Sequence, residues 1–244
     1  ESRLINFAMG WDATLGVWEG NAALASAGAV PDPLWIFGYG SLCWKADFPH
    51  DESFVGRVYG WRRFFAQRST DHRGTPEASG LVATLLSEEQ CVSFGVGTDE
   101  SASCVGMCYR VSKESVESVL SQLDFREKGG YSRSAVDVLH VGDGEADAPA
   151  PVRALLYTAT PDNPGFDRQV RGAAPPLHAR TSLTAARAQA LLDLDAAAAT
   201  ISRAIGPSGS NREYLLELSR FLHSVGERDD HIESLVARLS APPS

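Results

Sequence analysis

The order of the apolar patterns along the chain is the feature that most constrains its fold. Between residues 34 and 158, apolar runs of strand length alternate with glycine, proline and polar residues. The predicted strands are a short run that begins at residue 35, followed by 54–64, 80–85, 91–96, 105–111, 135–141 and 152–158. Helical patterns dominate the last third. Because strands come first and helices later, the chain is predicted to be α+β rather than a doubly wound parallel sheet.

Apolar residues spaced three or four apart predict amphipathic helices. The first follows Ser112, and its buried face is made of Val116, Val119, Leu120 and Leu123. A longer helix has an apolar stripe made of Leu191, Leu194, Ala198, Ile201 and Ile205. Two more helices are predicted at capping boxes, which are Ser210 with Glu213 and Asp230 with Glu233.

Composition bounds the organisation and the partners of the protein. With 43% apolar residues in 244, the chain can build a sizeable core, and residues 34–244 are predicted to form a single domain behind an N-terminal extension, 1–33. The net charge of −9 argues against binding to nucleic acid or to a membrane surface. The four cysteines show neither a metal-binding nor a disulfide-rich spacing, so we expect reduced thiols, no structural metal and a cytoplasmic location.

A glycine-punctuated loop is the first candidate for chemistry. The buried run breaks into alternating glycines and a serine, in the order Ile36, Phe37, Gly38, Tyr39, Gly40, Ser41 and Leu42. Glycine leaves room for a ligand beside the backbone, and successive N–H groups can converge on an anionic or carbonyl oxygen. The alternative interpretation is a plain corner between a strand and a turn.

Two charged segments are further candidates, each with a structural alternative. Positive groups cluster within 62–73 and can hold a carboxylate, or form ion pairs in a solvated loop; they are Arg62, Arg63, Arg68, His72 and Arg73. Glu127 lies between Arg126 and Lys128 at a predicted corner between helix and strand. Its carboxylate suits proton transfer if it points inward, and a surface ion pair if it does not.

Four separated segments together resemble one known family, the ChaC glutathione-specific gamma-glutamylcyclotransferases, and its ChaC2-like branch in particular. In chain order these segments are 35–44, 69–74, 123–131 and 206–215. The resemblance implies a small, mostly antiparallel β-barrel with surrounding helices. It also implies that Glu127 is the catalytic glutamate and that the loop 36–42 binds the gamma-glutamyl part of glutathione, largely through backbone groups.

The reaction that the resemblance implies needs no enzyme nucleophile. The α-amine of the gamma-glutamyl group attacks its own γ-amide carbonyl, which closes 5-oxoproline and releases Cys-Gly. The protein holds the reacting atoms together, and a carboxylate whose pKa is raised by desolvation moves the proton. Further expected substrate contacts are Arg73, Tyr131 and Tyr214, with no metal or cofactor, and the protein is expected to be a monomer or a homodimer.

Three rival functions remain open at this point. Cys43 with His72 could form a thiol nucleophile and its base, although Cys43 lies among bulky apolar residues. A module that binds gamma-glutamyl peptides without turning them over would need the loop but not Glu127. A cyclotransferase for other gamma-glutamyl amines would share the reacting half of the substrate.

Overall fold

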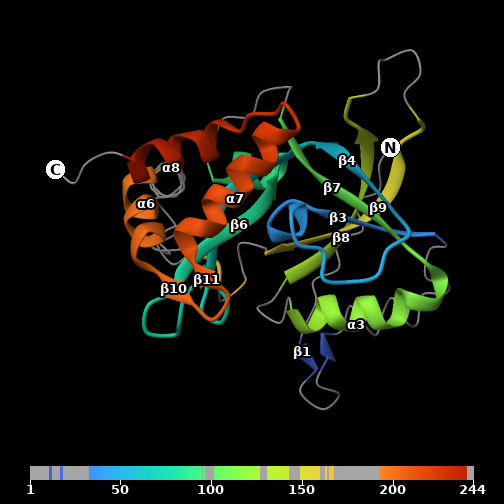
Figure 1. Cartoon of the computed structure of the whole chain (residues 1–244), viewed down its shortest axis with the longest axis horizontal. Coiled ribbons are helices and arrows are strands. Elements are labelled where there is room, and N and C mark those ends of the chain that lie inside the picture. The colour runs from blue at the N-terminus through green and yellow to red at the C-terminus, as the bar shows by residue number, and fades with distance from the viewer. Residues whose placement is uncertain are drawn as a thin grey trace, which may run out of the picture.

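A closed barrel of five strands forms the centre of the molecule (Figure 1). The computed structural model describes residues 11–12, 17–18, 33–94, 96, 102–126, 131–142, 149–159, 163, 165–167 and 193–240. The barrel order is β3-β7-β4-β8-β9. The strand bounds are β3 (Leu34–Gly38), β4 (Glu52–Tyr59), β7 (Ser103–Val111), β8 (Tyr131–His140) and β9 (Val152–Ala159).

Neighbouring barrel strands are antiparallel except where β9 pairs with β3 and closes the barrel in parallel. Alternate side chains on each strand point inward and fill the barrel, as the two-residue period of a strand requires. Buried examples are Phe37, Val58, Val138 and Leu156. This mixed architecture confirms the predicted α+β class.

A two-stranded hairpin extends the barrel on one side, and it corrects the prediction of one strand over 54–64. Gly60, with φ of 77°, separates β4 from β5 (Trp61–Ser69), and β5 pairs with β6 (Gly80–Ser87). A positive φ at this position is a conformation that glycine adopts without strain, so the chain turns there and leaves the barrel.

The helices α6 (Leu194–Arg203), α7 (Asn211–Ser224) and α8 (Asp230–Ser240) pack over this hairpin (Figure 1). Ser210 caps α7, as predicted, through its side chain and the Glu213 N–H. The cap of α8 is Asp229 rather than the predicted Asp230, because the Asp229 carboxylate accepts from the N–H groups that follow. Ile205, expected on the apolar stripe of α6, lies beyond the helix and is exposed.

A second correction concerns the segment 91–96, predicted as a strand. The helix α2 (Glu88–Ser93) covers its first half, and Ser87 with Gln90 forms a capping box at the start of this helix. Reciprocal side-chain bonds satisfy the first backbone donors of a helix, which the apolar run alone did not reveal. The strand prediction was therefore wrong.

The helix α3 (Val116–Arg126) covers the opposite side of the barrel (Figure 1). A 3-10 turn, η2 (Lys113–Ser115), precedes it. The predicted apolar face of α3 packs against outward-facing residues of β3, β7 and β9, and the buried members of that face are Val116, Val119 and Leu123. The barrel end reached by α3 carries the candidate site.

Short elements complete the described chain. They are β1 (Trp11–Asp12) paired with β2 (Val17–Trp18), β10 (Ile205–Gly206) paired with β11 (Gly209–Ser210), and the 3-10 turn η1 (Ser41–Cys43). Within the part of the chain that the structure describes, no helix is long and apolar enough to cross a membrane. The division into an extension, 1–33, and a single domain, 34–244, stays a prediction.

Gly106 offers a test of how closely β7 approaches β3. A methyl group on its α-carbon would overlap the backbone carbonyl oxygen of Gly38, which cannot move as a side chain can. We expect Gly106→Ala to lower the free energy of unfolding by about 1–3 kcal/mol in urea denaturation. The control Ser53→Ala, at an exposed position of β4, should change it by less than about 0.5 kcal/mol. Equal stability of the two variants would contradict the close approach.

Candidate active site

The glycine-punctuated loop leaves β3 at the barrel end, and its carbonyl groups are held by the protein. Each carbonyl from Gly38 to Leu42 accepts a hydrogen bond. The donors, in order, are Cys43 Sγ at 3.4 Å, Arg63 Nε at 3.1 Å, Cys43 N at 2.9 Å, Lys45 N at 2.9 Å and Tyr109 Oη at 2.5 Å. The backbone carbonyls of the loop therefore all have hydrogen-bond donors within the protein, without a ligand.

Holding a carbonyl also orients the N–H of the same peptide unit. In a planar trans peptide the C=O and N–H groups point in opposite directions. Because Arg63 is buried and holds the Tyr39 carbonyl, the Gly40 N–H of that unit points away from Arg63. This is the arrangement expected of a backbone cradle for an oxygen with negative charge.

A close neighbour leaves little space for a side chain at position 40. A β-carbon there would lie 2.6 Å from the hydroxyl oxygen of Tyr214, on α7. Tyr214 is itself buried, with its ring edge-on to Trp44 at 5.4 Å between centroids. The structure therefore brings Tyr214, a predicted site residue, against the loop.

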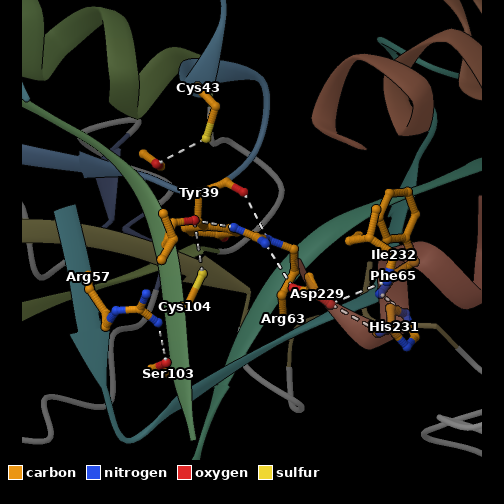
Figure 2. A network of polar contacts seen from close by, with 12 residues as sticks. Tyr39, Cys43, Arg57, Arg63, Phe65, Ser103, Cys104, Asp229, His231 and Ile232 are labelled. Atoms are coloured by element: carbon orange, nitrogen blue, oxygen red, sulfur yellow. Dashed lines mark hydrogen bonds and ion pairs between the residues drawn. The ribbon is translucent and has the colours of Figure 1, made fainter. Parts of the chain in front are cut away.

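Arg63 lies at the centre of a polar network behind the loop (Figure 2). Besides the Tyr39 carbonyl, its guanidinium donates to the Val105 carbonyl at 2.6 Å and pairs with Asp229 at 2.8 Å. Asp229 in turn caps α8, and His231 accepts from the Phe65 N–H at 3.1 Å. The network joins the loop to β5, β7 and α8.

The predicted positive patch is divided by the fold, so its description as one cluster was wrong. Arg63 points into the protein, whereas Arg62 lies over the ring of Phe64 on the other face of β5. Arg73 lies over the ring of Tyr214, with 5.6 Å from its guanidinium carbon to the ring centroid. It also pairs with Glu213 at 3.2 Å, so Arg73 already has an anionic partner beside the site.

The segment with Glu127 and its flank 128–130 lies outside the described residues, but both of its neighbours reach the same barrel end. Tyr131 starts β8 opposite Ala159, three residues beyond the parallel pair Leu156–Phe37. Near the end of α3, Asp124 accepts from the Tyr157 hydroxyl at 2.9 Å and pairs with Arg133. The topology therefore brings the residues on either side of Glu127 to the end of the barrel from which the loop leaves.

Tyr131 packs on the α3 side of the loop, in the apolar cluster that also receives Leu42 and contains the buried Ile36. Phe37 and Tyr39 belong to the other cluster, inside the barrel and under α7. The apolar side chains of the predicted loop 36–42 thus pack into two cores, and the polar groups that the loop can offer a ligand are its backbone N–H groups and the Ser41 hydroxyl.

The structure disfavours the thiol mechanism. Burial raises the pKa of the Cys43 thiol to about 12, and the nearby Arg63 offsets this only in part. The thiol donates to the Gly38 carbonyl, whereas His72 contacts Ser208 at 3.3 Å and the carboxylate of Asp71. Among the described residues, no group of His, Cys, Asp and Glu side chains is arranged to hold a metal.

Sequence reasoning assigned no separate role to Arg63 and none at all to Tyr109 or Asn211. Asn211 bonds both backbone groups of Leu81 at 2.7 Å and so joins α7 to β6. The one available signal was an arginine at an inward position of a strand, directly before Phe64 and Phe65. A charge in such a place must be paired when buried, which predicts a network but not its members.

Comparisons with known proteins find relatives of this chain in sequence and in fold. A family described as ChaC-like protein matches residues 34–194 and 184–241. The human glutathione-specific gamma-glutamylcyclotransferase 1 is 37% identical over 211 residues, covering 84% of this chain and 78% of that protein. Gamma-glutamylcyclotransferase 2-3 of Arabidopsis thaliana is 36% identical over 203 residues, covering 83% and 86%. A crystal structure of a glutathione-specific gamma-glutamylcyclotransferase from yeast is similar, with a TM-score of 0.68 and 25% identity, covering 84% of this chain and 95% of that one.

His231 provides a test of the network through pH. Burial lowers its pKa from the ordinary 6.5 to about 4, against the opposing effect of Asp229. Between these values the unfolded chain binds a proton that the folded protein does not. The free energy of unfolding should therefore fall as pH is lowered from about 6.5 to about 4, by up to about 1.4 kcal/mol per pH unit.

The variant His231→Gln keeps an acceptor for the Phe65 N–H and removes the titrating ring. Urea denaturation across this pH range should show a flatter dependence for His231→Gln than for wild type. The control His50→Gln, at an exposed position, should keep the wild-type slope. A slope that is the same in wild type and His231→Gln would show that His231 is not the group responsible.

Proposed function

Because this chain belongs to the ChaC family, we propose that it is a glutathione-specific gamma-glutamylcyclotransferase. It converts glutathione to 5-oxoproline and Cys-Gly. The observation that carries the proposal is the loop 38–42, whose carbonyls are all hydrogen-bonded by the protein. It occurs in a chain that is similar, over more than four fifths of the chain's length, to enzymes named for this activity.

Closing the lactam is an intramolecular reaction. The α-amine nitrogen forms a bond to the γ-carbonyl carbon, and the bond from that carbon to the cysteine nitrogen breaks. A glutathione molecule in solution samples many conformations, and a site that holds amine and carbonyl in contact removes that search. The backbone of the loop is suited to this task because each carbonyl from Gly38 to Leu42 is hydrogen-bonded within the protein.

Charge develops on the γ-carbonyl oxygen as the amine attacks. N–H groups of the glycine loop, including that of Gly40, are proposed to donate to this oxygen or to the glutamyl carboxylate. Such donors are effective because they are already oriented before the reaction and need not reorganise during it. The proposed substrate-binding residues remain 36–42, Arg73, Tyr131 and Tyr214.

Glu127 is proposed as the group that moves the proton. It takes a proton from the α-ammonium, so that the free amine can attack, and then takes a second from the same nitrogen as the neutral lactam forms. Both protons pass in turn to the cysteine nitrogen, which leaves as the ammonium of Cys-Gly, so the enzyme ends in its starting state. Support comes from its place in the family motif at 123–131 and from the barrel end that Asp124 and Tyr131 reach on either side of it.

Assignment to the ChaC2-like branch, a cytoplasmic location and a monomeric or homodimeric state are also proposals.

The first experiment measures Cys-Gly and 5-oxoproline from reduced glutathione, with wild type beside Glu127→Gln. This substitution keeps the side-chain shape and removes the titrating carboxylate, so kcat should fall about 10²- to 10⁴-fold. The control Glu117→Gln changes an exposed carboxylate on α3 and should keep the wild-type rate.

Each other outcome has a definite meaning. If wild type binds glutathione but releases no 5-oxoproline, the protein is a binding module and the enzymatic proposal fails. If Glu127→Gln and Glu117→Gln both keep full activity, the reaction stands but Glu127 is not its base.

Substrate breadth is a separate prediction. The reacting half of glutathione is shared by every gamma-glutamyl amine, so specificity must come from the cysteinyl-glycine half. We expect kcat/KM for glutathione to exceed that for gamma-glutamyl-alanine by about 100-fold or more, because lost polar contacts leave buried groups unpaired. Comparable values, measured by 5-oxoproline release, would instead support a cyclotransferase of broad specificity.

A further inference from the structure

We propose that Arg63 is a positioning residue for the reaction, acting through the Tyr39–Gly40 peptide unit of the loop. The inference rests on the proposed function for its kinetic consequence. Arg63 does not reach the substrate side of the loop, because its side chain is buried and directed at the barrel (Figure 2). Its effect is on the direction in which the Gly40 N–H points.

The contacts of Arg63 leave the Tyr39 carbonyl little freedom. The Nε atom donates to that carbonyl at 3.1 Å, while one terminal nitrogen donates to Val105 O at 2.6 Å and the other to Asp229 at 2.8 Å. A guanidinium is planar, so three bonds in different directions fix its plane and position. The peptide unit bonded to Nε is fixed in turn, and with it the Gly40 N–H.

The anchors of Arg63 are themselves fixed. Val105 lies in β7 and is paired with Arg57 of β4, and Asp229 is held by the N–H groups of His231 and Ile232 at the start of α8. A β-carbon on Gly40 would lie 2.6 Å from the hydroxyl of Tyr214, so α7 leaves little space beside the loop. The loop is therefore held between the Arg63 network and α7.

Lysine is not equivalent to arginine here. A lysine ammonium is a single point of charge and can pair with Asp229, but it cannot reproduce the fork that holds both backbone carbonyls. Arg63→Lys therefore separates the positive charge, which is kept, from the positioning bonds, which are lost.

Arg57 is the matched control. It also joins a barrel strand to the segment before α8, by bonds to Ser103 at 3.0 Å (Figure 2) and to Glu227 at 2.5 Å. Neither of these partners belongs to the loop. Arg57→Lys thus disturbs a similar bridge between barrel and helices without touching the Tyr39 carbonyl.

The experiment combines kinetics with glutathione and nuclear magnetic resonance of the Gly40 amide. For Arg63→Lys we expect kcat to fall about 10- to 100-fold with KM within about threefold, because misdirected donors weaken binding of the developing charge more than binding of the substrate. The Gly40 amide resonance should shift and its hydrogen should exchange faster. Arg57→Lys should lower Tm yet keep kcat within about twofold and leave the Gly40 resonance in place.

A second variant controls for the possibility that a single change at Arg63 unfolds the protein. Arg63→Gln with Asp229→Asn removes both charges together, so that neither is left buried without its partner. It should reproduce the loss of kcat and the change at Gly40. The proposal is overturned if the two lysine variants lose kcat equally and in step with Tm, or if the Arg63 variants leave the Gly40 amide unchanged.

Failure of the enzymatic function is distinguishable from failure of this inference. If wild type releases no 5-oxoproline, the proposed function falls. The resonance and exchange of the Gly40 amide then decide alone whether Arg63 positions the loop.

Discussion

A buried guanidinium is the constraint on which the arrangement around the loop depends. Removing the charge of Arg63 from water is costly, and the cost is offset only where its donors find acceptors in the right directions. Those acceptors are the Tyr39 and Val105 carbonyls and the Asp229 carboxylate, which belong to the loop, the barrel and the start of α8. Satisfying one arginine therefore sets the relative placement of three parts of the fold.

Hydrogen bonds of the same kind explain how a loop of small residues can form a site with a defined geometry. Glycines at 38 and 40 would be free to move if they stood alone, since they contribute no side chain to the packing. Here the flanking side chains enter two separate cores, and the carbonyls are bonded from behind by Arg63, Tyr109 and the turn η1. A lactam-forming reaction needs positioning and charge stabilisation more than an enzyme nucleophile, and a fixed backbone supplies both.

Local patterns predicted much of the barrel and missed what depends on distant partners. The strand before the loop and the strands β6, β7 and β9 followed from apolar runs, and Ser210 was found as a cap from its spacing to Glu213. The segment 91–96 was misassigned because a short buried run has the same composition in a helix and in a strand. The turn at Gly60 was missed, and 54–64 was predicted as one strand, because the residue type alone does not give the backbone angle.

From its residues alone the chain could be assigned to a fold class and, through four ordered motifs, to a family with a defined reaction. Motif order and apolar periodicity are local properties, so they can be read without coordinates. Folding added the bonds that join residues far apart in the chain, such as Tyr39 with Arg63, Leu42 with Tyr109 and Arg63 with Asp229. These bonds depend on how strands and helices meet in space. For that reason the positive residues of 62–73 were predicted to form one patch, whereas the fold buries Arg63 and places Arg62 and Arg73 on other surfaces.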